Sequence, residues 1–65
     1  MTPENWARRI VRKGGGWGML TGLRRGIAQI ERQFAAGEGD RVASDTLDDM
    51  RARRDALAAA QGETK

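Results

Sequence analysis

Hydrophobic residues recur at helical spacing in three stretches of the chain, and short glycine-rich or polar segments separate these stretches. In the clearest stretch, from about residue 19 to residue 36, large apolar residues follow one another at intervals of 3, 4, 3 and 4. They are Leu20, Leu23, Ile27, Ile30 and Phe34. Heptad-like spacing of this kind places all of them on one face of a helix. The pattern therefore predicts a long amphipathic helix in the middle of the chain.

Residues 1–13 predict a shorter amphipathic helix. Thr2 suits the N-cap and Pro3 suits the first helical position. One stripe of this helix is apolar and is formed by Trp6, Ala7, Ile10 and Val11. The remaining surface is basic and is formed by Arg8, Arg9, Arg12 and Lys13. A helix of about three turns needs tertiary packing, because isolated helices this short are seldom stable in water.

A glycine-rich segment, residues 14–18, follows the first helix. Consecutive glycines disfavour helix because they lose much backbone entropy, so we expect a hinge here, or a tight turn. The segment is not a Walker-type phosphate loop, because no Gly-Lys-Ser/Thr follows it. Trp17 lies among the glycines, and we expect its indole to pack on the core or on a partner.

Three glycines repeat every four residues beside the apolar face of the central helix, at Gly18, Gly22 and Gly26. Two interpretations are open. The glycines line a close contact with another helix or chain, because small residues let backbones approach. Alternatively the helix starts near Leu23, and the first glycines belong to the preceding loop. The charged residues Arg24, Arg25, Glu31 and Arg32 exclude a membrane span.

A polar segment, residues 37–44, should form the turn between the central helix and the last one. Gly37 is suited to the position after a helix C-terminus, and Val42 is expected to be the one apolar anchor of the turn.

The last helix is expected from about residue 45 to residue 61. Thr46 as N-cap with Asp49 three residues later makes a pattern like a capping box. Spacing predicts ion pairs between Asp49 and Arg53 and between Arg51 and Asp55. Gly62 should end the helix, and residues 62–65 should fray.

Together these elements predict an all-α fold. An antiparallel helical hairpin, residues 19–61, is preceded by the short basic helix, residues 1–13, and the glycine-rich hinge, residues 14–18. Val42, Leu47, Met50 and Leu57 should face the central helix. The last helix supplies fewer large apolar side chains than the central helix, so the apolar face of the central helix near Ile30 and Phe34 needs further cover. We expect Trp6, Ile10 and Trp17, or another chain, to supply it.

The composition limits the catalytic and metal-binding sites that the chain can form. The chain has 65 residues with 12 Lys and Arg against 9 Asp and Glu, a net charge of +3, and no Cys or His. It therefore lacks the usual general base, the thiol nucleophile and the commonest metal ligands. Ser44 has no His or Lys nearby in sequence to activate it, and the acids Asp45, Asp48 and Asp49 lack the alternation of a calcium loop. We expect no enzymatic activity, no cofactor and no bound metal.

Charge is unevenly distributed along the chain. Residues 1–25 carry six basic side chains and one acid, a net charge of +5, whereas residues 26–65 carry a net charge of −2. A basic segment can face nucleic acid, an acidic protein surface or solvent alone. The sequence shows no secretory signal and no membrane span, so we expect a protein of the cytoplasm or of a virus-like particle.

One family resemblance covers residues 27–60. An amphipathic helix and a short polar connection lead into Ser44-Asp45-Thr46-Leu47-Asp48-Asp49-Met50 and a helix that continues to Leu57. This order resembles the small head–tail joining proteins of tailed phages, of the lambda W type. In that family two helices flank a β-hairpin, whereas this chain has about eight residues at that place. The resemblance implies a non-enzymatic structural part of a virion or virus-like particle that contacts protein neighbours.

Two functional hypotheses follow. The first is an interaction protein that docks on a larger protein assembly or on itself. Its candidate contact residues are Trp6, Ile10, Trp17, Gly18, Gly22, Gly26 and Phe34. The second is a small basic regulator that binds nucleic acid through residues 8–25, or a phage-encoded inhibitor. Its candidate contact residues are Arg8, Arg9, Arg12, Lys13, Arg24 and Arg25.

Overall fold

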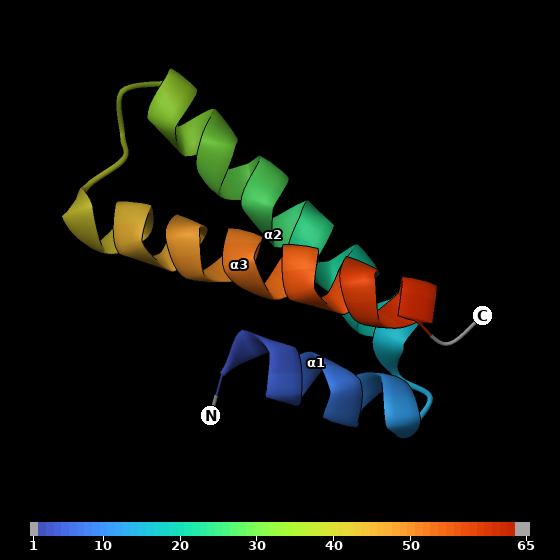
Figure 1. Ribbon diagram of the computed structural model, residues 1–65. Coiled ribbons are helices and arrows are strands. Elements are labelled where there is room, and N and C mark those ends of the chain that lie inside the picture. Colours follow the sequence, from blue (N-terminus) through green and yellow to red (C-terminus); the bar gives the residue numbers. More distant parts are fainter. Residues whose placement is uncertain (1, 64–65) are drawn as a thin grey trace.

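The computed structural model describes residues 2–63, and within this range the chain is helical and contains no strand. The helices are α1 (Pro3–Arg12), α2 (Gly16–Ala35) and α3 (Arg41–Glu63), as Figure 1 shows. The prediction of an all-α fold is confirmed. Met1 and residues 64–65 lie outside the described residues, and so does the part of the expected fraying that concerns residues 64–65.

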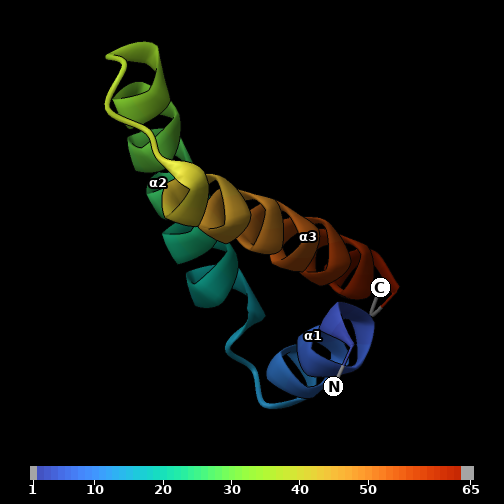
Figure 2. The same ribbon diagram turned by 90° about the vertical axis from the view of Figure 1, so that its left-hand side faces the viewer.

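Helix α3 lies between the other two helices (Figures 1 and 2). Helix α2 runs antiparallel to it, since Gly16 lies against Gln61 at one end while Phe34 and Leu47 line one groove at the other. The predicted hairpin is therefore present. Helix α1 runs in the same direction as α3 and packs along its C-terminal half. The described chain measures 40 × 21 × 15 Å, so it has two well-separated ends.

The core is small, and its main cluster, formed by Ala7, Leu20, Leu57 and Ala60, lies where the three helices meet. Its buried hydrophobic residues are Ala7, Leu20, Ile27, Leu47, Leu57 and Ala60. Ala7 on α1 and Ala60 on α3 are both nearly inaccessible, and their small side chains let the two helices approach closely. Two predicted core positions are corrected, because Val42 is 73% exposed and Phe34 is 38% exposed. Helix α1 packs over Leu20 and Leu57, and the residues that it contributes to this cluster leave Val42 and Phe34 exposed.

A tight turn, and not a hinge of residues 14–18, joins α1 to α2. The Gly14 N–H donates to Val11 O over 3.0 Å and the Gly15 N–H donates to Ile10 O over 3.2 Å, which together make a Schellman motif. Gly14 has φ +84°, a conformation that favours glycine. Helix α2 begins at Gly16, so Trp17 and Gly18 are helical. The predicted segment of residues 14–18 was too long, because the turn needs only Gly14 and Gly15 for its two hydrogen bonds.

The connection between α2 and α3 repeats the same C-terminal motif. Gly37 has φ +77°, and the Glu38 N–H donates to Gln33 O over 2.8 Å, so the role predicted for Gly37 is confirmed. Helix α3 then begins at Arg41, because the Asp40 carboxylate accepts the Ala43 N–H over 2.8 Å.

Both predicted ends of the last helix are corrected. Thr46 lies inside α3 and is not its N-cap, since Asp40 is a strong cap type and no helix breaker lies between it and Thr46. Val42 is accordingly part of the helix and anchors no turn. Gly62 also lies within α3, which runs to Glu63.

Candidate interaction surfaces

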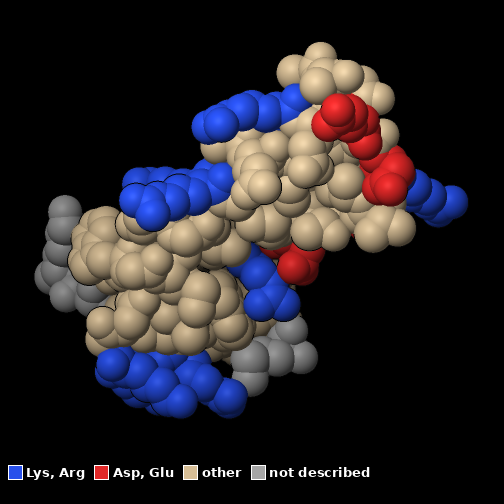
Figure 3. Space-filling view, turned by 180° about the vertical axis from the view of Figure 1, so that it is seen from behind, with Lys and Arg blue, Asp and Glu red and all other residues tan. Residues whose placement is uncertain are grey.

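Arg9, Arg12 and Lys13 cover the side of α1 that faces away from the core, and Arg8 lies at its edge, beside α3. Thr2 caps the helix by accepting the Asn5 N–H over 3.3 Å, and the apolar residues then face α3. Arg8, Arg9, Arg12 and Lys13 are all exposed. Figure 3 shows basic side chains gathered over this helix and along α2. We call Arg8, Arg9, Arg12 and Lys13 the α1 basic face.

Trp6 is used inside the molecule. It is half-buried and packs against the cluster formed by Ala7, Leu20, Leu57 and Ala60. The Arg53 guanidinium lies 5.0 Å from its ring centroid, a cation–π distance. The predicted ion pair of Arg53 with Asp49, at 2.9 Å, fixes that guanidinium.

Ile10 packs against the same cluster as Trp6. The prediction that Trp6 and Ile10 contact a partner is therefore not supported by their positions. Both side chains attach α1 to the rest of the fold.

Trp17 has the opposite environment. Its side chain is 67% exposed on the first turn of α2, so it does not pack on the core. Thr21 follows one turn later, and its hydroxyl donates to Trp17 O over 3.0 Å. Arg24 and Arg25, both exposed, lie about two turns after Trp17 on the same side of the helix. We call Trp17, Thr21, Arg24 and Arg25 the Trp17 surface.

The glycine repeat of α2 is helical, which decides between the two open interpretations of its conformation. A Cβ at Gly18 or at Gly22 would meet no heavy atom within 4 Å, so neither glycine serves a close contact within the chain. A Cβ at Gly26 would meet the Met50 methyl group of α3. The close-packing interpretation therefore holds within the chain at Gly26.

A groove with an apolar wall lies at the other end of the molecule, where α2 and α3 approach their connection. Its volume is about 380 Å³, and it is lined by Glu31, Phe34, Ser44, Leu47, Asp48 and Arg51. We call it the Phe34 groove. Phe34 sits against Gly39, where an added Cβ would strike the ring. Arg51 pairs with Glu31 over 3.1 Å and Arg54 pairs with Asp55 over 3.1 Å, which replaces the predicted pair of Arg51 with Asp55.

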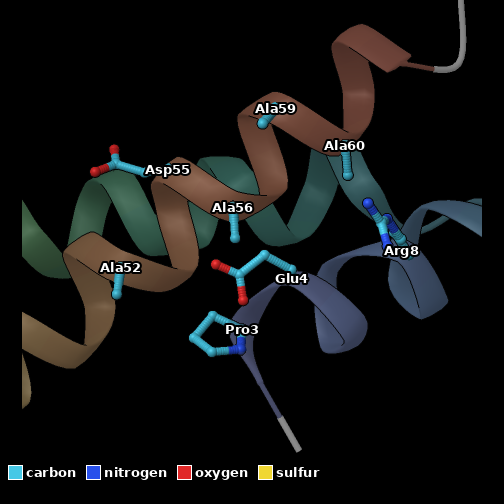
Figure 4. Close-up of a pocket in the computed structure, with 8 residues that line it drawn as sticks. All are labelled: Pro3, Glu4, Arg8, Ala52, Asp55, Ala56, Ala59 and Ala60. Carbon is cyan, nitrogen blue, oxygen red and sulfur yellow. The ribbon is translucent and has the colours of Figure 1, made fainter.

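A second groove, of about 400 Å³, lies between α1 and α3. Figure 4 shows its wall of small side chains on α3, with Glu4 pointing toward Ala56 and Arg8 beside Ala60. Alanines leave this space because they fill little of the gap between the two helices. The ionisable residues that line the groove are Glu4, Arg8 and Asp55.

The two ends of the molecule have opposite charge. Residues 26–49 carry six acids and two basic residues, a net charge of −4, against +5 for residues 1–25. Figure 3 shows acidic side chains toward the end formed by the α2–α3 connection, and basic ones over α1 and along α2. Residues 50–65 carry a net charge of +2, so the net charge of −2 counted over residues 26–65 conceals this acidic segment.

Two further findings concern the described residues. Residues 2–63 contain no group of three or more acidic, His or Cys side chains placed to hold a metal ion. No helix in the same range combines the length and the apolar character that crossing a membrane requires.

No family model matches the chain, and no curated protein or solved structure matches it either.

Proposed function

We propose that this chain is a small non-enzymatic interaction protein, which docks on protein neighbours of a larger assembly through the Trp17 surface. One observation carries the proposal: the Trp17 indole is 67% exposed on a regular helix while much smaller side chains fill the core. Exposing an indole costs hydrophobic free energy, and tryptophan is enriched at the energetic centres of protein interfaces. A docking role explains why the Trp17 indole, unlike that of Trp6, lies outside the packed core.

The charge around Trp17 indicates the kind of surface it meets. Arg24 and Arg25 share its side of α2, and the α1 basic face adds four more cations to the same third of the chain. Opposite charges at the edge of an interface speed association and select partners. The proposed neighbour therefore presents an apolar recess edged by acidic side chains. The phage-type particle remains a proposed setting, supported by the sequence resemblance.

A photo-crosslinking amino acid placed at position 17 tests this function in the cells that express the gene. Position 58 is the matched control, because Ala58 is also exposed and helical but lies on α3. We expect a discrete protein product from position 17 and none from position 58. Equal labelling from both positions, or no protein product from position 17, would reject the docking surface.

Nucleic-acid binding is the second candidate, and a specific observation favours it. All six basic residues of the first 25 are exposed, and Trp17 is available to stack on a base. Such binding should weaken steeply between about 50 and 200 mM salt, because bound cations release counterions from the phosphates. A titration with single-stranded DNA and RNA over this range decides it, and absence of binding at the lower salt rejects this candidate.

A further inference from the structure

We infer that the neighbour met by the Trp17 surface is a second copy of this chain, and that Trp17 of one copy docks in the Phe34 groove of the next. The inference rests on the proposed function and narrows it to one partner. Three properties of the structure support it: the two apolar side chains that line the groove, the charges of the two ends, and the distance between them.

The Phe34 groove has the features that an indole needs. Phe34 and Leu47 give it apolar walls, and its volume of about 380 Å³ falls in the range of small-ligand pockets. Phe34 is 38% exposed, so the groove still has aromatic surface to cover. An aromatic pair between Trp17 and Phe34 would add to the free energy of burial.

The charges around the two surfaces are complementary. Glu31, Asp48 and Arg51 line the groove, and because Arg51 pairs with Glu31 the remaining charge is that of Asp48. Asp45 is exposed on the adjacent turn of α3. Arg24 and Arg25 accompany Trp17 on α2. Docking therefore brings the +5 segment of one copy to the −4 segment of the next. Docking between two identical ends would instead bring like charges together, which disfavours a symmetric contact.

The two surfaces lie at opposite ends of the helical hairpin. Helix α2 starts beside the C-terminal part of α3 and ends at the α2–α3 connection, so Trp17 is far from the Phe34 groove of its own chain (Figure 1). When the two ends of one copy meet two different neighbours, each contact is heterologous. Repetition of this contact gives a ring if the rotation closes and a filament if it does not.

The association should be weak. The ends are limited by the two short dimensions of the molecule, 21 and 15 Å. That cross-section is well below the roughly 800 Å² that each partner buries in a standard interface. We therefore expect monomers at low micromolar concentration and association as the concentration rises, with a strong decrease at high salt because exposed charges are screened.

Two variants separate the halves of the contact. Trp17→Ala removes the docking side chain, and Asp48→Lys reverses a charge in the groove. Both positions are exposed, so the fold should persist. Asp55→Lys is the matched control, since it reverses an exposed acid of α3 outside the groove. We expect each of the first two variants to weaken association at least about tenfold, a change of about 1.4 kcal/mol, while Asp55→Lys associates like the natural chain.

Mixing the variants gives the decisive result, measured by sedimentation velocity. Trp17→Ala keeps an intact groove and Asp48→Lys keeps an intact tryptophan, so an equimolar mixture should form one-to-one pairs that grow no further. A natural chain that stays monomeric at all concentrations, or a mixture that restores no pairing, overturns the inference. If position 17 nevertheless crosslinks to a different protein in cells, the proposed function stands without self-association.

Discussion

Trp6 and Trp17 have the same chemistry and opposite positions in this protein. Trp6 packs on the core with the Arg53 guanidinium over its ring, and Trp17 is 67% exposed. Neither periodicity nor composition separates the two, because both residues stand at the apolar edge of a helix. The two indoles differ in burial because α1 packs against α3 at a place that only the tertiary structure determines. Sequence reasoning consequently placed both among the candidate partner contacts.

Glycines on α2 give a prediction at the same scale. Gly22→Ala should stabilise the chain by about 0.5–1 kcal/mol, because alanine is the better helix former and its Cβ would meet nothing within 4 Å. Gly26→Ala should gain less, since its Cβ displaces the Met50 methyl group. Urea unfolding followed by circular dichroism measures both. A loss of stability in Gly22→Ala, or a larger gain in Gly26→Ala, contradicts the described packing.

The start of α3 is the element that sequence reasoning placed least well. Ser44, Asp45 and Thr46 are all good cap types, so local preference offered several starting points. Asp40 precedes them and makes the cap bond to the Ala43 N–H. By contrast, α1 and its Thr2 cap, the end of α2 at Gly37 and the pairing of α2 with α3 were predictable, because each depends on spacing or on one cap residue. The additional turn also explains why Val42 is on the surface.

Two substitutions distinguish the alternative helix starts. Asp40→Ala should cost about 0.5–2 kcal/mol of stability, because it leaves the Ala43 N–H without its acceptor. Thr46→Ala should be neutral or stabilise by at most about 0.5 kcal/mol, since Thr46 lies inside the helix and is exposed. Thermal unfolding of both variants gives the comparison, and the reverse order would place the cap at Thr46.

At the scale of the whole molecule, α3 supports two helices and the charge separates toward two ends. The core holds six buried hydrophobic residues among those described, and α1 adds the cover that the hairpin lacks on one side. The Phe34 end receives no such cover, which leaves Phe34 and Leu47 in a groove that is lined mainly by residues of the acidic segment. Sequence reasoning found the shortage of apolar surface there, but the groove itself depends on the angle at which α2 and α3 diverge.

The account depends most on Trp17 being accessible in the isolated chain, and acrylamide quenching of tryptophan fluorescence measures that directly. The chain has two tryptophans, so Trp6→Phe and Trp17→Phe each leave one. In dilute protein, we expect strong quenching and red-shifted emission from Trp17 in Trp6→Phe, and weaker quenching of Trp6 in Trp17→Phe. If Trp17 in the dilute monomer is quenched as weakly as Trp6, the exposed docking surface is contradicted.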